Sequence, residues 1–194
     1  MIKFDIKRLY NWQFITVISL FIASIIGFIN FESSLIFKII FIALVVLLAI
    51  YFLGIDAPEY FNIIVLFLVI FDCYNLYFSM NIPLWSVMII SAVLVWILAY
   101  IFLESCKDKI GNKLYYVYSV LLSLVILEIF LALISWPTDP KSKSMIIVSI
   151  FYIFYLMILE KGTNSLNWKK ILPYIISVIL IIVFVVITTK WYGY

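Results

Sequence analysis

Two carboxylate side chains stand inside long apolar stretches of this sequence, Asp72 within residues 60–78 and Glu128 within residues 114–136. An acid in the middle of a membrane-spanning helix costs about 2.5 to 3.5 kcal/mol, so its presence implies a role. Intramembrane carboxylates bind protons or cations in transport proteins, or they pair with neighbouring groups that hold helices together. Both chemistries are therefore open to Asp72 and Glu128.

Further polar residues accompany these acids. Asn75 and Ser79 follow Asp72 at i+3 and i+7, the spacing that places side chains on one face of a helix. Lys38 lies one turn into the apolar stretch before them, where it can pair with an acid or reach the membrane surface. The sequence thus predicts a proton- or cation-binding site of Asp72, Glu128 and Asn75, with Lys38 as counter-charge. A structural role for each acid is the alternative.

Small residues recur every four positions in the first apolar stretch, at Ser19, Ala23 and Gly27. This small-xxx-small spacing lets two helix backbones approach closely. It predicts a face for helix packing, either within the chain, which we favour, or against a partner subunit.

The overall composition identifies the solvent around these elements. Hydrophobic residues make up 68% of the 194 residues and charged residues 12%. A soluble domain contains about 45 to 50% apolar and about 25% charged residues, and a globule of this size cannot bury the excess. Membrane lipids must therefore surround the chain, in agreement with a mean hydropathy of +1.26. We predict one transmembrane helical domain over residues 1–194, without a soluble domain.

Seven apolar stretches alternate with short polar connections that carry nearly all the charges. All but the sixth reach the roughly 17 residues that cross a hydrocarbon core. The sequence therefore predicts an all-α bundle of seven transmembrane helices, with six as the alternative. The predicted helices cover residues 14–30, 35–53, 60–78, 84–102, 114–136, 145–159 and 171–189.

The basic residues predict the orientation of these helices. With a cytoplasmic amino terminus, nine of the 13 basic residues lie on the cytoplasmic side, and the reverse orientation inverts that bias. We therefore expect a multi-pass protein of a cell inner membrane, with its amino terminus inside and its carboxyl terminus outside. The nine residues are Lys3, Lys7, Arg8, Lys107, Lys109, Lys113, Lys161, Lys169 and Lys170.

Residue types that carry most enzyme chemistry are scarce. The chain has no histidine, which argues against His-dependent catalysis and His-ligated metal or haem sites. Arg8 is its only arginine, and Cys73 and Cys106 form no CxxC pair. A net charge of +3 without a basic run argues against nucleic acid as a partner. We expect no cofactor, no metal site and no catalytic residue.

These features favour some functions over others. Secondary transporters usually bind substrate where Gly or Pro breaks a helix near mid-membrane. Here the five prolines fall at predicted helix ends or in connections. Uninterrupted helices and short connections favour a non-catalytic subunit or accessory component of a membrane complex, docked to other membrane protein subunits. The alternative is a proton- or cation-coupled small-solute transporter that uses Asp72 and Glu128. The prolines are Pro58, Pro83, Pro137, Pro140 and Pro173.

Overall fold

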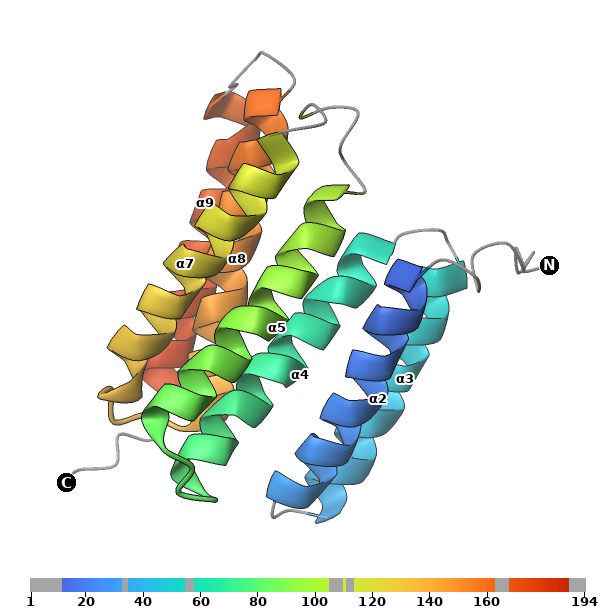
Figure 1. Cartoon of the computed structure of the whole chain (residues 1–194), viewed down its shortest axis with the longest axis vertical. Coiled ribbons are helices and arrows are strands. Elements are labelled where there is room, and N and C mark those ends of the chain that lie inside the picture. The colour runs from blue at the N-terminus through green and yellow to red at the C-terminus, as the bar shows by residue number, and fades with distance from the viewer. Residues whose placement is uncertain are drawn as a thin grey trace. The chain divides into compact units, whose positions relative to one another are not determined.

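The computed structural model describes residues 12–32, 35–54, 58–104, 110, 114–162 and 168–188. Within them the chain forms seven α-helices and no strand (Figure 1). Each of the seven predicted helices is present, so the all-helical prediction is confirmed. The helices are α2 (Trp12–Phe31), α3 (Leu35–Gly54), α4 (Pro58–Phe78), α5 (Leu84–Glu104), α7 (Leu114–Ile134), α8 (Pro140–Gly162) and α9 (Trp168–Thr188).

Six of these helices are long and apolar enough to cross a membrane. Lipid offers no hydrogen-bond partner to the backbone, so a spanning segment has to pair its N–H and C=O groups internally, as a helix does. In the remaining helix, α3, the apolar segment among the described residues is the shorter Lys38–Leu48. The chain is a polytopic, all-helical membrane protein.

The start of α8 differs from the prediction, because the helix begins five residues earlier, at Pro140. Asp139 caps it, since its Oδ2 accepts a hydrogen bond from the Ser142 N–H at 3.4 Å. Lys143 then lies inside the helix, only 1% exposed, and its Nζ donates to the Ile134 carbonyl at 3.1 Å. Lys143, which hydropathy places in a connection, thus lies in a helix and satisfies a carbonyl group at the end of α7.

One proline does not lie where the sequence placed it. α9 begins three residues before its predicted start, so Pro173 lies inside this helix. The expectation that every proline falls at an end or in a connection is therefore wrong for Pro173. Proline removes one backbone N–H from the helix, and the Pro173 carbonyl here accepts a hydrogen bond from Ser177 Oγ at 2.9 Å. Pro173 lies about 7.5 Å from the start of α9, well short of its middle.

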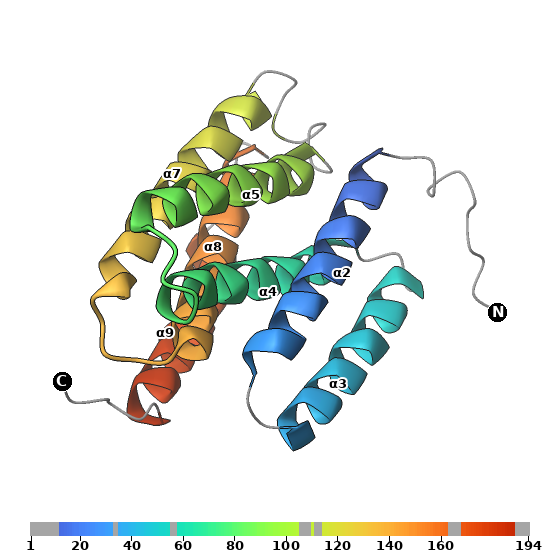
Figure 2. The same ribbon diagram turned by 60° about the horizontal axis from the view of Figure 1, so that its bottom comes forward.

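The chain divides into two compact units, Met1–Ile82 and Pro83–Tyr194. The amino-terminal unit contains α2, α3 and α4, and the carboxyl-terminal unit contains α5, α7, α8 and α9. In the carboxyl-terminal unit each helix packs against the next one along the chain, as can be followed in Figure 2. The single domain over residues 1–194 stays a prediction.

Phenylalanine side chains form the core of the amino-terminal unit. Phe28 of α2 lies between Phe41 of α3 and Phe71 of α4, with ring centroids 4.4 and 5.1 Å away. Phe21 of α2 contacts Phe61 of α4 at 5.0 Å. Because the contacts advance in the same direction along both helices, α2 and α4 run parallel. Their close packing places residues of α2 against the acid on α4.

A tyrosine cluster joins α5 to α7 in the carboxyl-terminal unit. The ring of Tyr100 lies 5.6 Å from that of Tyr115 and 5.4 Å from that of Tyr116. Their hydroxyl groups are hydrogen-bonded to one another, and Tyr100 is also bonded to Glu104. Tyrosine suits the end of a membrane helix because its ring is apolar and its hydroxyl polar. These contacts fix the α5–α7 pair at one end.

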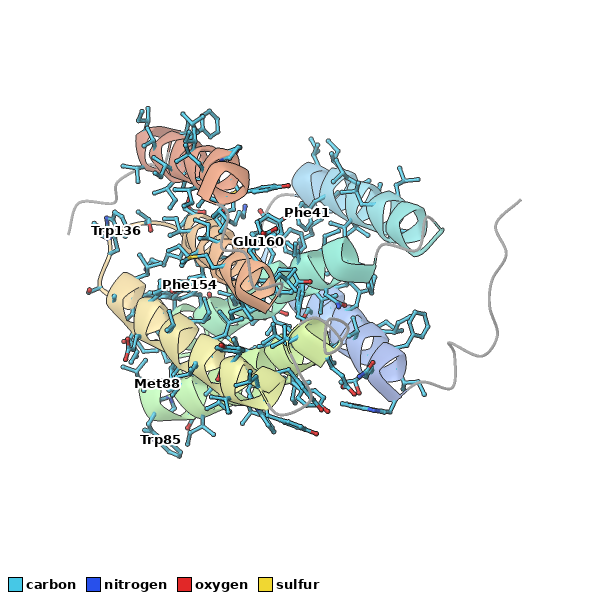
Figure 3. All side chains as sticks on the ribbon, turned by 90° about the horizontal axis from the view of Figure 1, so that it is seen from above. Phe41, Trp85, Met88, Trp136, Phe154 and Glu160 are labelled. Carbon is cyan, nitrogen blue, oxygen red and sulfur yellow. The ribbon has the colours of Figure 1, made fainter. Side chains whose placement is uncertain are left out.

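The outer surface of the helices is apolar. Large hydrophobic side chains are exposed on all seven helices, as expected for surfaces that face lipid. Trp85, near the start of α5, points away from the ribbon in Figure 3. Any charged side chain on such a surface therefore needs an explanation.

Candidate functional site

The Asp72 carboxyl group of α4 lies directly against the backbone of α2 at Gly27. A Cβ atom added at Gly27 would stand 2.6 Å from the carboxyl carbon and from each carboxyl oxygen of Asp72. Real Cβ atoms do not approach other atoms so closely, so the carboxyl group occupies the space that a side chain at position 27 would need. The lack of a side chain at Gly27 therefore makes room for the acid.

Ser24 supplies the second contact to this acid. It is buried on α2, nearly one turn before Gly27, and its hydroxyl donates a hydrogen bond to the Asp72 carboxyl group. Oδ1 of Asp72 is buried as well and has no hydrogen-bond partner among the described residues. Ser24, Gly27 and Asp72 thus form one small polar contact inside the amino-terminal unit, which we call the α2–α4 acid contact.

The other polar residues of α4 are engaged differently. Asn75 is buried, and its Nδ2 donates to the Phe71 carbonyl of the same helix at 2.8 Å. Ser79 is exposed just beyond the end of α4. Only Asp72 and Asn75 of the i, i+3, i+7 stripe therefore lie on α4, and the three residues lie in three environments.

Lys38 lies on α3 and is partly exposed. It forms no hydrogen bond or ion pair with another residue that the structure describes. Asp72 and Lys38 belong to the amino-terminal unit, and Glu128 belongs to the carboxyl-terminal unit. A site shared by these three residues stays a prediction.

Glu128 is exposed on α7. The buried face of this helix contains Leu122, Ile126 and Phe130, and Glu128 points about 160° away from each of the last two at 100° per residue. It forms no hydrogen bond or ion pair within the described part of the chain. Glu128 therefore lies on the outside of the carboxyl-terminal unit.

The small residues of α2 do not share one environment. Ser19 and Ala23 are exposed, whereas Gly27 faces Asp72. Packing inside the unit uses a neighbouring face of the helix that includes Val17, Ser24 and Phe28. The role of the Ser19–Ala23 face in docking stays a prediction.

Ser24 and Lys143 are two of the buried polar residues that sequence reasoning missed. Ser24 lies three residues before Gly27, close enough along the helix to face the same neighbour, and this spacing was the available signal. Lys143 follows the Asp139-Pro140 pair, which is typical of a helix start, and this pair indicates that the lysine belongs to α8.

The groups above are the sequence-predicted candidates for chemistry that the structure describes. No three Asp, Glu or Cys side chains come together there closely enough to hold a metal ion. The α2–α4 acid contact can take up a proton or pack two helices, and Glu128 can pair with a cationic or hydrogen-bonding group. No family model, curated protein or solved structure matches this chain. Its function therefore has to be inferred from these residues and their surroundings.

Proposed function

We propose that the chain is a non-catalytic subunit or accessory component of a membrane complex. The observation that carries this proposal is the exposed position of Glu128 on α7, opposite the buried face of that helix. A carboxylate in contact with lipid is unfavourable, and a second subunit that covers it removes this cost. The α2–α4 acid contact supports the same conclusion, because it uses Asp72 to pack two helices of this chain.

The native mass of the protein tests the proposal. After gentle solubilisation at its own expression level, we expect a particle heavier than a homo-oligomer, with other membrane chains present in a fixed ratio. Quantitative mass spectrometry of the intact particle measures that ratio. Recovery of the chain alone, as a monomer or a homo-oligomer, would contradict the proposal.

A proton- or cation-coupled small-solute transporter is a second candidate function. The observation that favours it is Oδ1 of Asp72, a buried acceptor without a partner in the described residues. Buried polar atoms normally have a hydrogen-bond partner, and a bound proton or cation would supply one. In this function Glu128 would contribute the second acid.

The substitutions Asp72→Asn and Glu128→Gln separate the two candidates. A coupling ion that binds the folded state raises its thermal stability, so a transporter should show an unfolding temperature that depends on Na⁺ or on pH. Asp72→Asn would abolish that dependence, and Glu128→Gln, which removes the second acid, would weaken or abolish it. In the subunit function, we expect the unfolding temperature of the wild type to be independent of Na⁺. Thermal unfolding in detergent, with and without Na⁺, measures the difference.

We also propose an inner-membrane location with the amino terminus in the cytoplasm. The bias of nine among 13 basic residues supports this orientation through the positive-inside rule. Reporter proteins fused to either terminus, active only on one side of the membrane, check it.

A further inference from the structure

One side of α7 forms a stripe that is exposed along most of the helix. Val117, Leu121, Leu124 and Glu128 follow one another at intervals of four, three and four residues, so they lie on the same face. All four are exposed, and Leu124 beside the acid is 51% exposed. We call these residues the α7 outer stripe. Its apolar part suits lipid or another helix, but Glu128 suits only a polar neighbour.

The depth of Glu128 limits what can cover it. It lies six residues before the end of α7 at Ile134, or about 9 Å along the helix axis. Lysine and arginine have long stems that bring their charge to the membrane surface, and glutamate has a shorter one. A neighbour within the membrane is therefore needed to neutralise this carboxylate.

We propose that the α7 outer stripe docks a transmembrane helix of another subunit, and that this helix carries a lysine or arginine at the depth of Glu128. The inference rests on the proposed function and names the surface and the chemistry of the partner. Charge complementarity selects a cation, because a cation both satisfies the carboxylate and is itself neutralised in the membrane. The flanking valine and leucines provide the apolar contact that two packed helices need.

Two cations of this chain, Lys143 and Lys38, are poor candidates for that role. Lys143 is buried, and its Nζ donates to the Ile134 carbonyl. Lys38 lies only three residues from the start of α3, about 4.5 Å along the axis, where its stem reaches the membrane surface. A second copy of the chain that brings Lys38 to Glu128 is the competing occupant of the stripe, and crosslinking has to distinguish it from a different subunit.

A photoreactive amino acid at position 124 tests the inference in native membranes. Leu124 faces the proposed partner, and Leu180 of α9, 63% exposed, is the matched control on another helix. We expect a discrete adduct from position 124 and none from position 180. Mass spectrometry should map it to a membrane segment of a different protein that contains a lysine or arginine. An adduct to this chain, in the same or a second copy, would overturn the inference.

Charge reversal provides the second measurement. Glu128→Lys should lower the yield of the position-124 adduct at least tenfold, and a glutamate in place of the partner's mapped cation should restore it. Because Glu128 is exposed, the variant should fold, which an unchanged unfolding temperature verifies. An adduct whose yield does not change in Glu128→Lys would overturn the inference. If the adduct yield is unchanged but other chains still co-purify in a fixed ratio, only this inference fails and the proposed function stands. If the protein is recovered without other chains, the proposed function fails as well.

Discussion

Replacing Phe28 with alanine is expected to destabilise the amino-terminal unit by about 3 kcal/mol. Phe28 is only 1% exposed and contacts Phe41 of α3 and Phe71 of α4, so one side chain connects all three helices of the unit. Its truncation leaves a cavity between them. Lipid is as apolar as the core, so the loss comes from van der Waals contacts, which places the effect at the low end of the range for buried phenylalanines.

Reversible unfolding in mixed micelles measures this change. Ile26→Ala is the matched control, because Ile26 lies two residues away on the same helix but is 56% exposed. Its effect should stay within about 0.5 kcal/mol, as for most surface substitutions. Equal effects of the two substitutions would contradict the packing of α2 against α3 and α4.

The seven helices could be predicted because the signal for each is long and simple. About 20 apolar residues in a row can only be helical in lipid, whatever their neighbours are. The residues at which the helices begin and end were harder to predict, as the earlier start of α8 at Pro140 shows. Lys143 and Lys141 resemble a connection when hydropathy alone is considered, yet Lys143 is buried and bonded to the end of α7. The buried position of Lys143 is explained by its hydrogen bond to α7, which hydropathy cannot predict.

The α2–α4 acid contact could be predicted only in part. Gly27 and Asp72 were both identified, one as a packing residue and one as an acid in need of a partner. Nothing in the sequence says that they meet, because the register between two helices depends on the packing of the whole unit. Ser24 was missed for the same reason, since a single serine among mostly apolar residues does not show which neighbour it faces.

Glu128 shows the same limit on a single helix. The polar residues of α7 do not gather on one face, because Ser119 and Ser123 are buried and Glu128 is exposed, so periodicity cannot tell which face is buried. The structure assigns Glu128 to the exposed face, where a neighbouring chain can contact it. The role of Glu128 therefore stays a prediction, and the structure adds only that its side chain is exposed.

Gly27→Ala should destabilise the protein even though alanine is the better helix former. Alanine in a helix interior gains about 1 kcal/mol over glycine. Its Cβ would stand 2.6 Å from three atoms of Asp72, so the carboxyl group has to rotate away and lose its hydrogen bond to Ser24. Overpacking of this kind costs about 1 to 3 kcal/mol, so we expect a net loss of about 1 kcal/mol. Ala23→Leu, a larger change at an exposed position of α2, should have little effect.

The sign of the Gly27→Ala effect should reverse when Asp72 is first replaced with alanine. Without the carboxyl group the new Cβ has room, and only the gain in helix propensity remains, so Gly27→Ala should then stabilise the protein by up to about 1 kcal/mol. The resulting coupling between the two positions is about 2 kcal/mol, within the range measured for residues in contact. Unfolding of the four proteins in mixed micelles gives this coupling directly. Additive effects of the two substitutions on the free energy of unfolding would show that the Asp72 carboxyl group does not contact Gly27. A strong coupling would establish that the acid of α4 serves in helix packing, in contrast to Glu128, which is exposed on α7.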